Sequence, residues 1–288
     1  MKIVFFGTPD YVLPVLKILY KYHDIVAVVT QPPRPTGRKQ ILSYSPVDAF
    51  AHKHHIPTIY EFEKIPKADL GIVAAYGKII PEFLIFNFKF LILNIHPSLL
   101  PKYRGASPIQ AAITGNETQI GATIIRMDSE VDHGPIIAQF KDELMPEDTL
   151  ETVRKRLFER SAQVLIDLIP KYLKGKIKPR EQNHAEATFT KIVKKADGFI
   201  NLKKDNPLEI ERKLRAYTPW PGCWTQLRSS SFAGQVKRIK ILKAHLDIKH
   251  KQSLALCAQT LVIDMVQLEG KNPVSWKQFK EAYPHLSF

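Results

Sequence analysis

The sequence predicts an α/β protein, with an open, mostly parallel sheet followed by a smaller β-rich domain. Three observations support this fold class. Apolar segments of strand length alternate with segments of helical periodicity in the first part of the chain. A polar, basic stretch without clear periodicity begins at Lys176, and short apolar runs follow it. Continuous apolar strands that alternate with helices are typical of a parallel sheet covered on both faces.

The first part of the chain contains a repeated strand–helix–strand pattern. Residues 2–6 and 24–30 are apolar enough for buried strands, and the segment 11–22 between them has the period of a helix. The pattern continues with helix 46–55, strand 68–77, short helix 79–85, strand 90–95, short helix 108–114, and strands 120–127 and 135–140. A long amphipathic helix is expected at 149–173, with Asp148 or Thr149 as its N-cap and Gly175 beyond its end.

Three regions follow from this pattern. We expect a first domain at residues 1–178, a basic linker at 179–200 and a second domain at 201–288. In the last of these, residues 206–216 suit a helix and 219–222 a turn. The short apolar runs that predict its strands are residues 223–227, 238–244, 253–258 and 261–268.

Charge is distributed unevenly along the chain. Of the 42 Lys and Arg and 28 Asp and Glu, 19 basic and 18 acidic residues precede Lys171, which leaves 23 and 10 from there on. The net charge is therefore +1 in the first part and +13 in the second. Such an excess on one module favours a surface that faces a polyanion, for which nucleic acid is the leading candidate. The alternative is charge that serves solubility alone.

The remaining composition indicates a globular protein of a reducing compartment. Cys223 and Cys257 fit no zinc spacing and are expected to be packed thiols. The first residues contain one lysine and a brief apolar run, shorter than the ~7 to 15 apolar residues of a signal peptide. No later run reaches the ~18 apolar residues of a membrane span. A cytoplasmic location without membrane attachment fits best.

The stretch LNIHPSLLPKYRG, residues 93–105, ends a buried strand with an amide and an imidazole. Ligands of an open parallel sheet bind outside the carboxyl ends of the strands. Asn94 and His96 are two residues apart, so their side chains project from the same face. The amide can stabilise charge on a carbonyl oxygen and the imidazole can exchange protons, a pair that serves acyl transfer. The alternative is that both side chains only satisfy backbone groups at the strand end.

Two neighbouring features favour the catalytic interpretation. Pro97 and Pro101 make the loop that follows His96 stiff and suited to a flat ligand. The acidic turn 128–135 joins two strands and can bring the carboxylate of Asp132 to His96. A carboxylate beside an imidazole favours its protonated form and fixes its orientation.

These residues resemble the folate-dependent formyltransferases, which move a formyl group from 10-formyltetrahydrofolate to an amine. The resemblance rests on the unbroken stretch Asn94–Gly105 and on the later Asp-x-Gly-Pro at Asp132–Pro135. It implies a Rossmann-like fold, a catalytic set of Asn94, His96 and Asp132, and no metal. It also implies that folate lies along Ala75, Tyr76, Gly77, Ser98, Leu99, Leu100 and Pro101. His133 departs from the small or polar residue expected after the aspartate, and is either a surface turn residue or one that alters access.

The acceptor depends on other motifs. Glycinamide ribonucleotide formyltransferases have a glycine-rich phosphate loop after the first strand, whereas Phe6–Asp10 here holds one glycine and a proline. This FGTPD stretch, with Thr30–Lys39 and Ser45–Val47, is instead similar to methionyl-tRNA formyltransferases. The loop after the second strand contains the basic residues Arg34, Arg38 and Lys39. We expect them to contact tRNA phosphates, and Arg38 is the first candidate.

The C-terminal part resembles the same family. Residues 187–202 are similar to its interdomain segment, and 215–227 and 268–283 to its closing domain, an OB-like β-barrel that binds tRNA. The resemblance therefore implies formylation of methionyl initiator tRNA. Nothing in the sequence suggests a dimer seam, so a monomer is expected. Two alternatives stay open: a sugar N-formyltransferase acting on a nucleotide-linked amino sugar, and an RNA-binding relative without catalysis.

Overall fold

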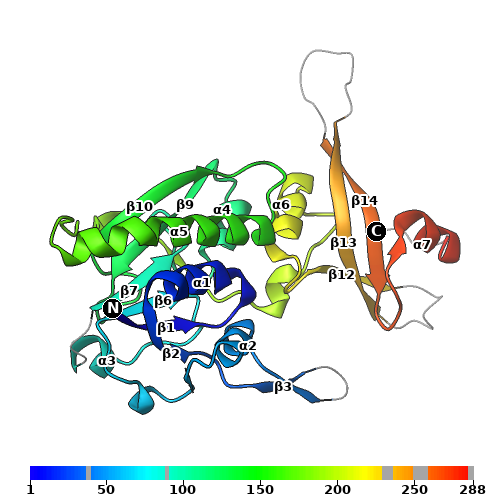
Figure 1. Cartoon of the computed structure of the whole chain (residues 1–288). Coiled ribbons are helices and arrows are strands. Elements are labelled where there is room, and N and C mark those ends of the chain that lie inside the picture. Colours follow the sequence, from blue (N-terminus) through cyan, green and yellow to red (C-terminus); the bar gives the residue numbers. More distant parts are fainter. Residues whose placement is uncertain (37–39, 88–90, 229–235, 249–258, 285–288) are drawn as a thin grey trace. The chain divides into compact units, whose positions relative to one another are not determined.

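The structure is a computed structural model that describes residues 1–36, 40–87, 91–228, 236–248 and 259–284. The chain divides into two compact units, and Figure 1 labels most of their helices and longer strands. Unit 1 consists of residues 1–108, 119–143 and 152–190. Unit 2 consists of residues 109–118, 144–151 and 191–288. Residues Arg38, Lys39 and Cys257, and the apolar run 253–258, lie outside the described residues.

Unit 1 is built on a seven-stranded sheet of order β10-β9-β7-β6-β1-β2-β5. Five of its strands are parallel, namely β1 (Lys2–Gly7), β2 (Asp24–Val29), β5 (Thr58–Ile59), β6 (Leu70–Ala74) and β7 (Leu91–His96). β9 (Gln119–Arg126) runs antiparallel to β7, and β10 (Ile136–Glu143) antiparallel to β9. The predicted open, mostly parallel α/β sheet is confirmed.

Helices cover both faces of this sheet because the strands are apolar on both sides. Ile3 and Phe5 of β1 belong to one core cluster and Val4 and Phe6 to another, as alternation along a strand requires. The first cluster contains residues of α1 (Leu13–Tyr22), α2 (Pro46–Lys53) and α5 (Leu150–Leu173). The second contains Leu84 of α3 (Glu82–Asn87). Two covered faces explain the continuous apolar strands in the sequence.

Most elements begin and end within a few residues of the sequence prediction. One shift is at α3, expected at 79–85, which begins after Pro81. Proline has no N–H to give and suits the start of a helix, so the segment before it stays irregular. Helix α5 ends as predicted, since Gly175 has a φ of 68° and Lys176 N–H donates to Lys171 O at 2.9 Å.

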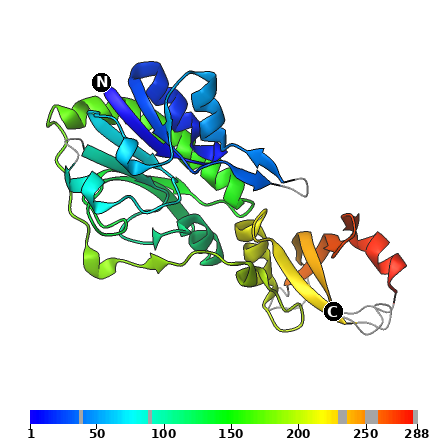
Figure 2. The same cartoon turned by 90° about the horizontal axis from the view of Figure 1, so that it is seen from below.

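Several short elements of unit 1 were not predicted. β3 (Arg34–Thr36) and β4 (Ile41–Ser43) form a hairpin after β2, which projects from the rest of unit 1 in Figure 2. β8 (Arg104–Gly105) pairs with β11 (Phe189–Thr190). Unit 1 also contains the 3-10 turns η1 (Asp10–Val12), η2 (Phe62–Lys64) and η3 (His184–Glu186). Elements of two or three residues are too short to show a period in sequence.

Unit 2 is an antiparallel β domain with helices. Its four-stranded sheet has the order β12 (Cys223–Arg228), β13 (Val236–Ile248), β14 (Gln259–Leu268) and β15 (Val274–Ser275). Its helices are α4 (Pro108–Thr114), α6 (Pro207–Tyr217) and α7 (Trp276–Ala282), together with the 3-10 turn η4 (Lys195–Gly198). The predicted small β-rich second domain is confirmed, and its strands are antiparallel. Its described strands follow a linear order, so closure into the barrel that the resemblance implies is not seen among them.

Helix α7 was missed by the sequence interpretation although its start carries a clear signal. Ser275 Oγ accepts the N–H of Gln278, and the Gln278 side chain accepts the N–H of Ser275, which makes a capping box. Phe279 of this helix enters the core of unit 2 with Cys223. Cys223 is fully buried and free, which confirms a packed thiol at this position, and this burial raises the pKa of the thiol to about 12.

Residues 179–200, expected as a linker, divide between the two units at Thr190. Arg180 exchanges two backbone hydrogen bonds with Ile136 of β10, and Thr188 O accepts the N–H of Arg104. The first half of this segment therefore packs on unit 1. None of the helices in the described part of the chain has the length and apolar character that crossing a membrane requires.

Candidate active site

Asn94 and His96 occupy the carboxyl end of β7, where the sheet changes direction. On one side β7 is parallel to β6, with Val73 opposite Asn94. On the other it is antiparallel to β9, with Thr123 opposite His96. The two side chains leave the strand on the same face because they are two residues apart. This edge of a sheet is where open α/β proteins bind ligands.

Asp132 reaches both side chains from the turn between β9 and β10. Its Oδ1 accepts a hydrogen bond from Asn94 Nδ2 at 3.1 Å. Its Oδ2 lies 3.4 Å from His96 Nδ1 and accepts the backbone N–H of Gly105 at 2.8 Å. The side chains of His96 and Asp132 are only 6% and 12% exposed. Little water screens the pair, so the carboxylate acts strongly on both neighbours.

Both ring nitrogens of His96 face oxygen atoms. Nε2 lies 2.8 Å from the carbonyl oxygen of Tyr103, which can only accept, and Nδ1 faces Asp132. A neutral imidazole has one N–H and satisfies one of these acceptors, whereas an imidazolium satisfies both. The ring is thus held at both nitrogens.

The backbone around Asp132 is shaped by two glycines and by the aspartate itself. Asp132 has a φ of 52°, a left-handed conformation that Asp tolerates better than most residues. A Cβ at Gly134 would overlap the carbonyl oxygen of Arg126. A Cβ at Gly105, where φ is 100°, would lie 2.7 Å from Thr190 O. The close approach of three backbone segments therefore brings the carboxylate to the end of β7.

The loop Ser98–Pro101 is held by side chains of the neighbouring strands. Thr123 Oγ1 donates to Ser98 O at 2.6 Å and accepts the N–H of Leu100 at 3.1 Å. Gln139 Nε2 donates to Leu100 O at 2.9 Å. Ser98 and Leu100 are buried, while Leu99 and Pro101 are half-buried, and the Leu100–Pro101 peptide bond is cis. Backbone groups of Ser98 and Leu100 thus have partners within the protein.

Residues Ala75, Tyr76 and Gly77 follow β6 at the same edge, beside the end of β7. Ala75 and Gly77 have φ values of 45° and 82°. The Tyr76 ring is buried in the core, and burial raises the pKa of its hydroxyl. Its carbonyl oxygen accepts hydrogen bonds from Thr8 Oγ1 at 2.9 Å and Gln31 Nε2 at 3.3 Å. The tyrosine side chain thus serves packing, and the segment can offer a ligand mainly its backbone.

Comparison with known proteins gives the family. The model described as formyl transferase matches residues 1–169, and that described as formyl transferase, C-terminal domain, matches residues 192–284. A methionyl-tRNA formyltransferase of Koribacter versatilis is 36% identical over 301 residues, which cover 98% of this chain and 96% of that protein. The chain belongs to the methionyl-tRNA formyltransferase family. It is accordingly an enzyme that formylates methionyl-tRNA.

A second relative agrees with this assignment, and a solved structure agrees with the fold. A methionyl-tRNA formyltransferase of Chloroflexus aurantiacus is 40% identical over 236 residues, which cover 78% of this chain and 76% of that protein. HypX of Aquifex aeolicus, solved in complex with tetrahydrofolic acid, superposes with a TM-score of 0.67 at 17% identity. That match covers 99% of this chain and 48% of HypX, and it bears on the fold alone.

Several residues around the site were not found from the sequence. Tyr103 O and Gly105 N–H lie within the stretch Asn94–Gly105, but their roles depend on how the chain folds back after Pro101. Gln182 reaches the turn of Asp132 from the segment expected as a linker. Arg104 and Gln182 are buried polar residues, and the hydrophobic periodicity of the sequence does not predict burial at such positions.

His133 makes contacts that explain its place in the turn. Its Nδ1 lies 2.7 Å from Asp128 Oδ2, and its ring stacks on that of His184 at 4.0 Å between centroids, with 7° between the ring planes. Neither partner of the His133 side chain belongs to the set Asn94, His96 and Asp132. No group of three or more His, Cys, Asp and Glu side chains in the described residues could hold a metal ion.

Of the three basic residues expected to contact tRNA, only Arg34 lies among the described residues. Arg34 lies in β3, exposed, with Nη2 3.3 Å from Gln31 Oε1. Arg38 and Lys39 lie outside the described residues. Leu42 and Ile41 of β4 are 53% and 65% exposed on the same hairpin.

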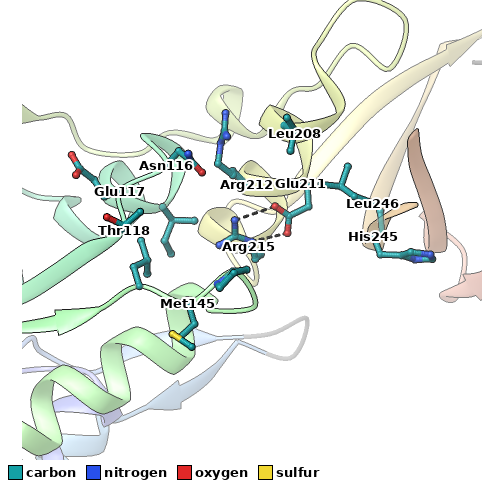
Figure 3. A pocket seen from close by; sticks show the side chains of 14 residues that line it. Asn116, Glu117, Thr118, Met145, Leu208, Glu211, Arg212, Arg215, His245 and Leu246 are labelled. Carbon is teal, nitrogen blue, oxygen red and sulfur yellow. Dashed lines mark hydrogen bonds and ion pairs between the residues drawn. The ribbon is translucent and has the colours of Figure 1, made fainter. Parts of the chain in front are cut away.

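A separate cavity of about 420 Å³ lies within unit 2 and is shown in Figure 3. It is lined by the end of α4, the residues around Met145, and parts of α6 and β13. Glu211 and Arg215 form a two-pronged ion pair at its wall, with distances of 2.6 and 3.0 Å. Asn94, His96 and Asp132 do not line this cavity, so it is distinct from the candidate active site.

Proposed function

We propose that the chain transfers the formyl group of 10-formyltetrahydrofolate to the amino group of methionyl initiator tRNA through Asn94, His96 and Asp132. The observation that carries this assignment of roles is the meeting of all three side chains at one edge of the sheet. Asp132 contacts Asn94 and His96 with different oxygens of one carboxylate. Family membership supports the reaction, and this geometry supports the residues.

Asn94 and His96 stabilise the oxyanion that forms when the neutral amine attacks the formyl carbon. An amide NH₂ has two N–H groups, and one of those of Asn94 is used by Asp132, so the other is left for the oxygen. Asp132 holds Nδ1 of His96, so Nε2 is the nitrogen that serves the substrate in place of Tyr103 O. Such preorganised donors are commonly worth ~10² to 10³ in kcat each.

Proton movement completes the reaction. The attacking amine becomes positively charged and must lose a proton, while the departing N10 of folate must gain one. His96 gives its proton to N10 and then takes the proton of the amine, and Asp132 stabilises the imidazolium before the first transfer and after the second. The C–N bond to folate breaks as the new C–N bond to the methionyl amine is complete, with no net change in charge.

We place the folate along Ala75, Tyr76 and Gly77 and along the loop Ser98–Pro101. Both segments begin at the carboxyl ends of adjacent parallel strands. The fixed loop backbone suits a flat ring system, because little freedom is lost when the ligand binds. The tetrahydrofolate bound to HypX supports a folate donor for this fold. No metal has a role in this proposal.

We place the tRNA on the β3–β4 hairpin and on the basic C-terminal part, with its +13 net charge. The hairpin follows β2 at the carboxyl edge of the sheet, as Asn94 and His96 follow β7. We further propose that the enzyme acts as a monomer in the cytoplasm, where translation is initiated.

Arg38→Ala is expected to weaken the reaction with tRNA and to flatten its dependence on salt. Removing one phosphate contact lowers the slope of log Kd against log salt by about one. Titrating methionyl-tRNA at several salt concentrations measures this slope, and Lys17→Ala on α1 is a matched change of charge outside the hairpin. An unchanged slope for Arg38→Ala would count against the contact.

The activity itself is tested by incubation with 10-formyltetrahydrofolate and methionyl initiator tRNA. Formylmethionyl-tRNA is the expected product. Formylation of a nucleotide-linked amino sugar instead would identify a sugar N-formyltransferase. Binding of tRNA without turnover on any amine would identify a relative that has lost catalysis.

A further inference from the structure

A buried polar pair lies directly behind the turn that carries Asp132. Gln182 is 5% exposed and Arg104 is 3% exposed. They are 78 positions apart in the chain and meet through two hydrogen bonds, from Arg104 Nε at 3.2 Å and Nη2 at 2.8 Å to Gln182 Oε1. Buried polar side chains are costly unless their hydrogen bonds are made, so such a pair has a definite geometry.

The amide nitrogen of Gln182 faces the backbone of the turn that carries Asp132. Nε2 lies 2.9 Å from Asp132 O, 2.9 Å from His133 O and 2.8 Å from Gly134 O. The orientation of this amide follows from its partners. Arg104 can only donate, so the amide oxygen faces it, and the three carbonyl oxygens can only accept, so the NH₂ group faces them.

The chain segment of Arg104 also contacts the carboxylate of Asp132. Gly105, the residue after Arg104, donates its N–H to Asp132 Oδ2 at 2.8 Å. Asp132 is therefore held at its backbone by Gln182 and at its side chain by the strand of Arg104. A residue with a φ of 52° keeps that conformation only if its surroundings impose it.

We propose that Gln182 is a positioning residue for the formyl transfer, acting through Asp132. Its two N–H groups hold the carbonyl groups of residues 132–134, with one N–H shared between two of them, so that the carboxylate meets Asn94 and His96 with a different oxygen each. This inference rests on the proposed function, because it assigns Gln182 a role through the catalytic aspartate. Arg104 orients the Gln182 amide and completes the clamp.

Gln182→Glu tests the clamp with a side chain of the same size. It keeps an oxygen for Arg104 but places a carboxylate oxygen against three carbonyl oxygens, which pushes the turn away. A displacement of ~1 Å at a catalytic group costs about 10²-fold in rate. We expect kcat to fall by this factor, with KM for methionyl-tRNA and for 10-formyltetrahydrofolate within about threefold of the wild type.

Asn183→Asp is the matched control. It introduces the same charge one residue away, at an exposed side chain whose amide donates to Glu186. Its kcat should remain close to that of the wild type. An equal loss in both variants would show a general effect of charge and overturn the role of Gln182.

A double-mutant cycle with Asp132→Asn separates positioning from mere structural support. If Gln182 acts through Asp132, Gln182→Glu has little further effect on kcat once Asp132 is replaced. Full additivity of the two losses would overturn the proposal. If Gln182→Glu does not fold, Gln182→Met, which removes the donors without adding charge, takes its place in the cycle with the same two outcomes.

Wild-type turnover in the same assay distinguishes the two possible failures. Absence of formylmethionyl-tRNA with the wild type would overturn the proposed function. Normal turnover of both the wild type and Gln182→Glu would overturn the positioning role alone.

Discussion

Asp132→Asn is expected to lower kcat for formylation on the order of 10³-fold or more, while affinity for tRNA is retained. The substitution keeps the shape but replaces one carboxylate oxygen with a donor. Asn94 and Gly105 both donate to Asp132, and His96 Nδ1 faces it, so an amide group cannot satisfy all three. An aspartate-to-asparagine change beside a catalytic histidine has a comparable effect, ~10⁴-fold, in serine proteases.

Single-turnover formylation and a separate tRNA binding titration measure the two effects. His96→Ala should lose activity in the same way. It should also retain tRNA affinity, since the His96 side chain is buried at the site and adds no charge to the surface. Asp128→Asn is the matched control, because it makes the same chemical change in the same turn but contacts His133 instead. Loss of tRNA affinity in Asp132→Asn would refute this division of roles.

Gly105→Ala is expected to destabilise unit 1 by about 3 kcal/mol and to reduce turnover as well. The left-handed backbone costs a residue with a side chain ~1 to 2 kcal/mol. The added methyl group would also meet the Thr190 carbonyl oxygen at 2.7 Å, and forced contacts of this kind cost ~1 to 3 kcal/mol. If β8 moves away from β11 to relieve this contact, the N–H of Gly105 moves as well. That N–H is the one that donates to Asp132.

Gly175→Ala isolates the first of these two costs. Gly175 also has a positive φ, of 68°, but a Cβ there would meet no atom within 4 Å. Urea denaturation of both variants should show a loss for Gly105→Ala about twice that of Gly175→Ala or more. Equal losses, with normal turnover of Gly105→Ala, would mean that the contact with Thr190 does not constrain the site.

The sheet of unit 1 and the shared face of Asn94 and His96 could be predicted from the sequence alone. Central strands such as β1 are apolar on both faces, and a strand of that kind can only lie between two layers. Asn94 and His96 share a face because of their spacing alone, and the prolines that follow them restrict the loop locally. The uneven charge was equally visible, because it is a property of composition.

The full set of groups that meet at that strand end follows from the tertiary fold, although Asp132 was already a candidate from the sequence. The turn of Asp132 follows a strand that runs antiparallel to β7, and this pairing brings the carboxylate back to Asn94. Gln182 stands in a polar segment that looks like a linker, yet it is buried against residues 132–134. Local periodicity fixes the face on which a side chain lies, whereas the partner that satisfies a buried polar group depends on chain segments far away in sequence.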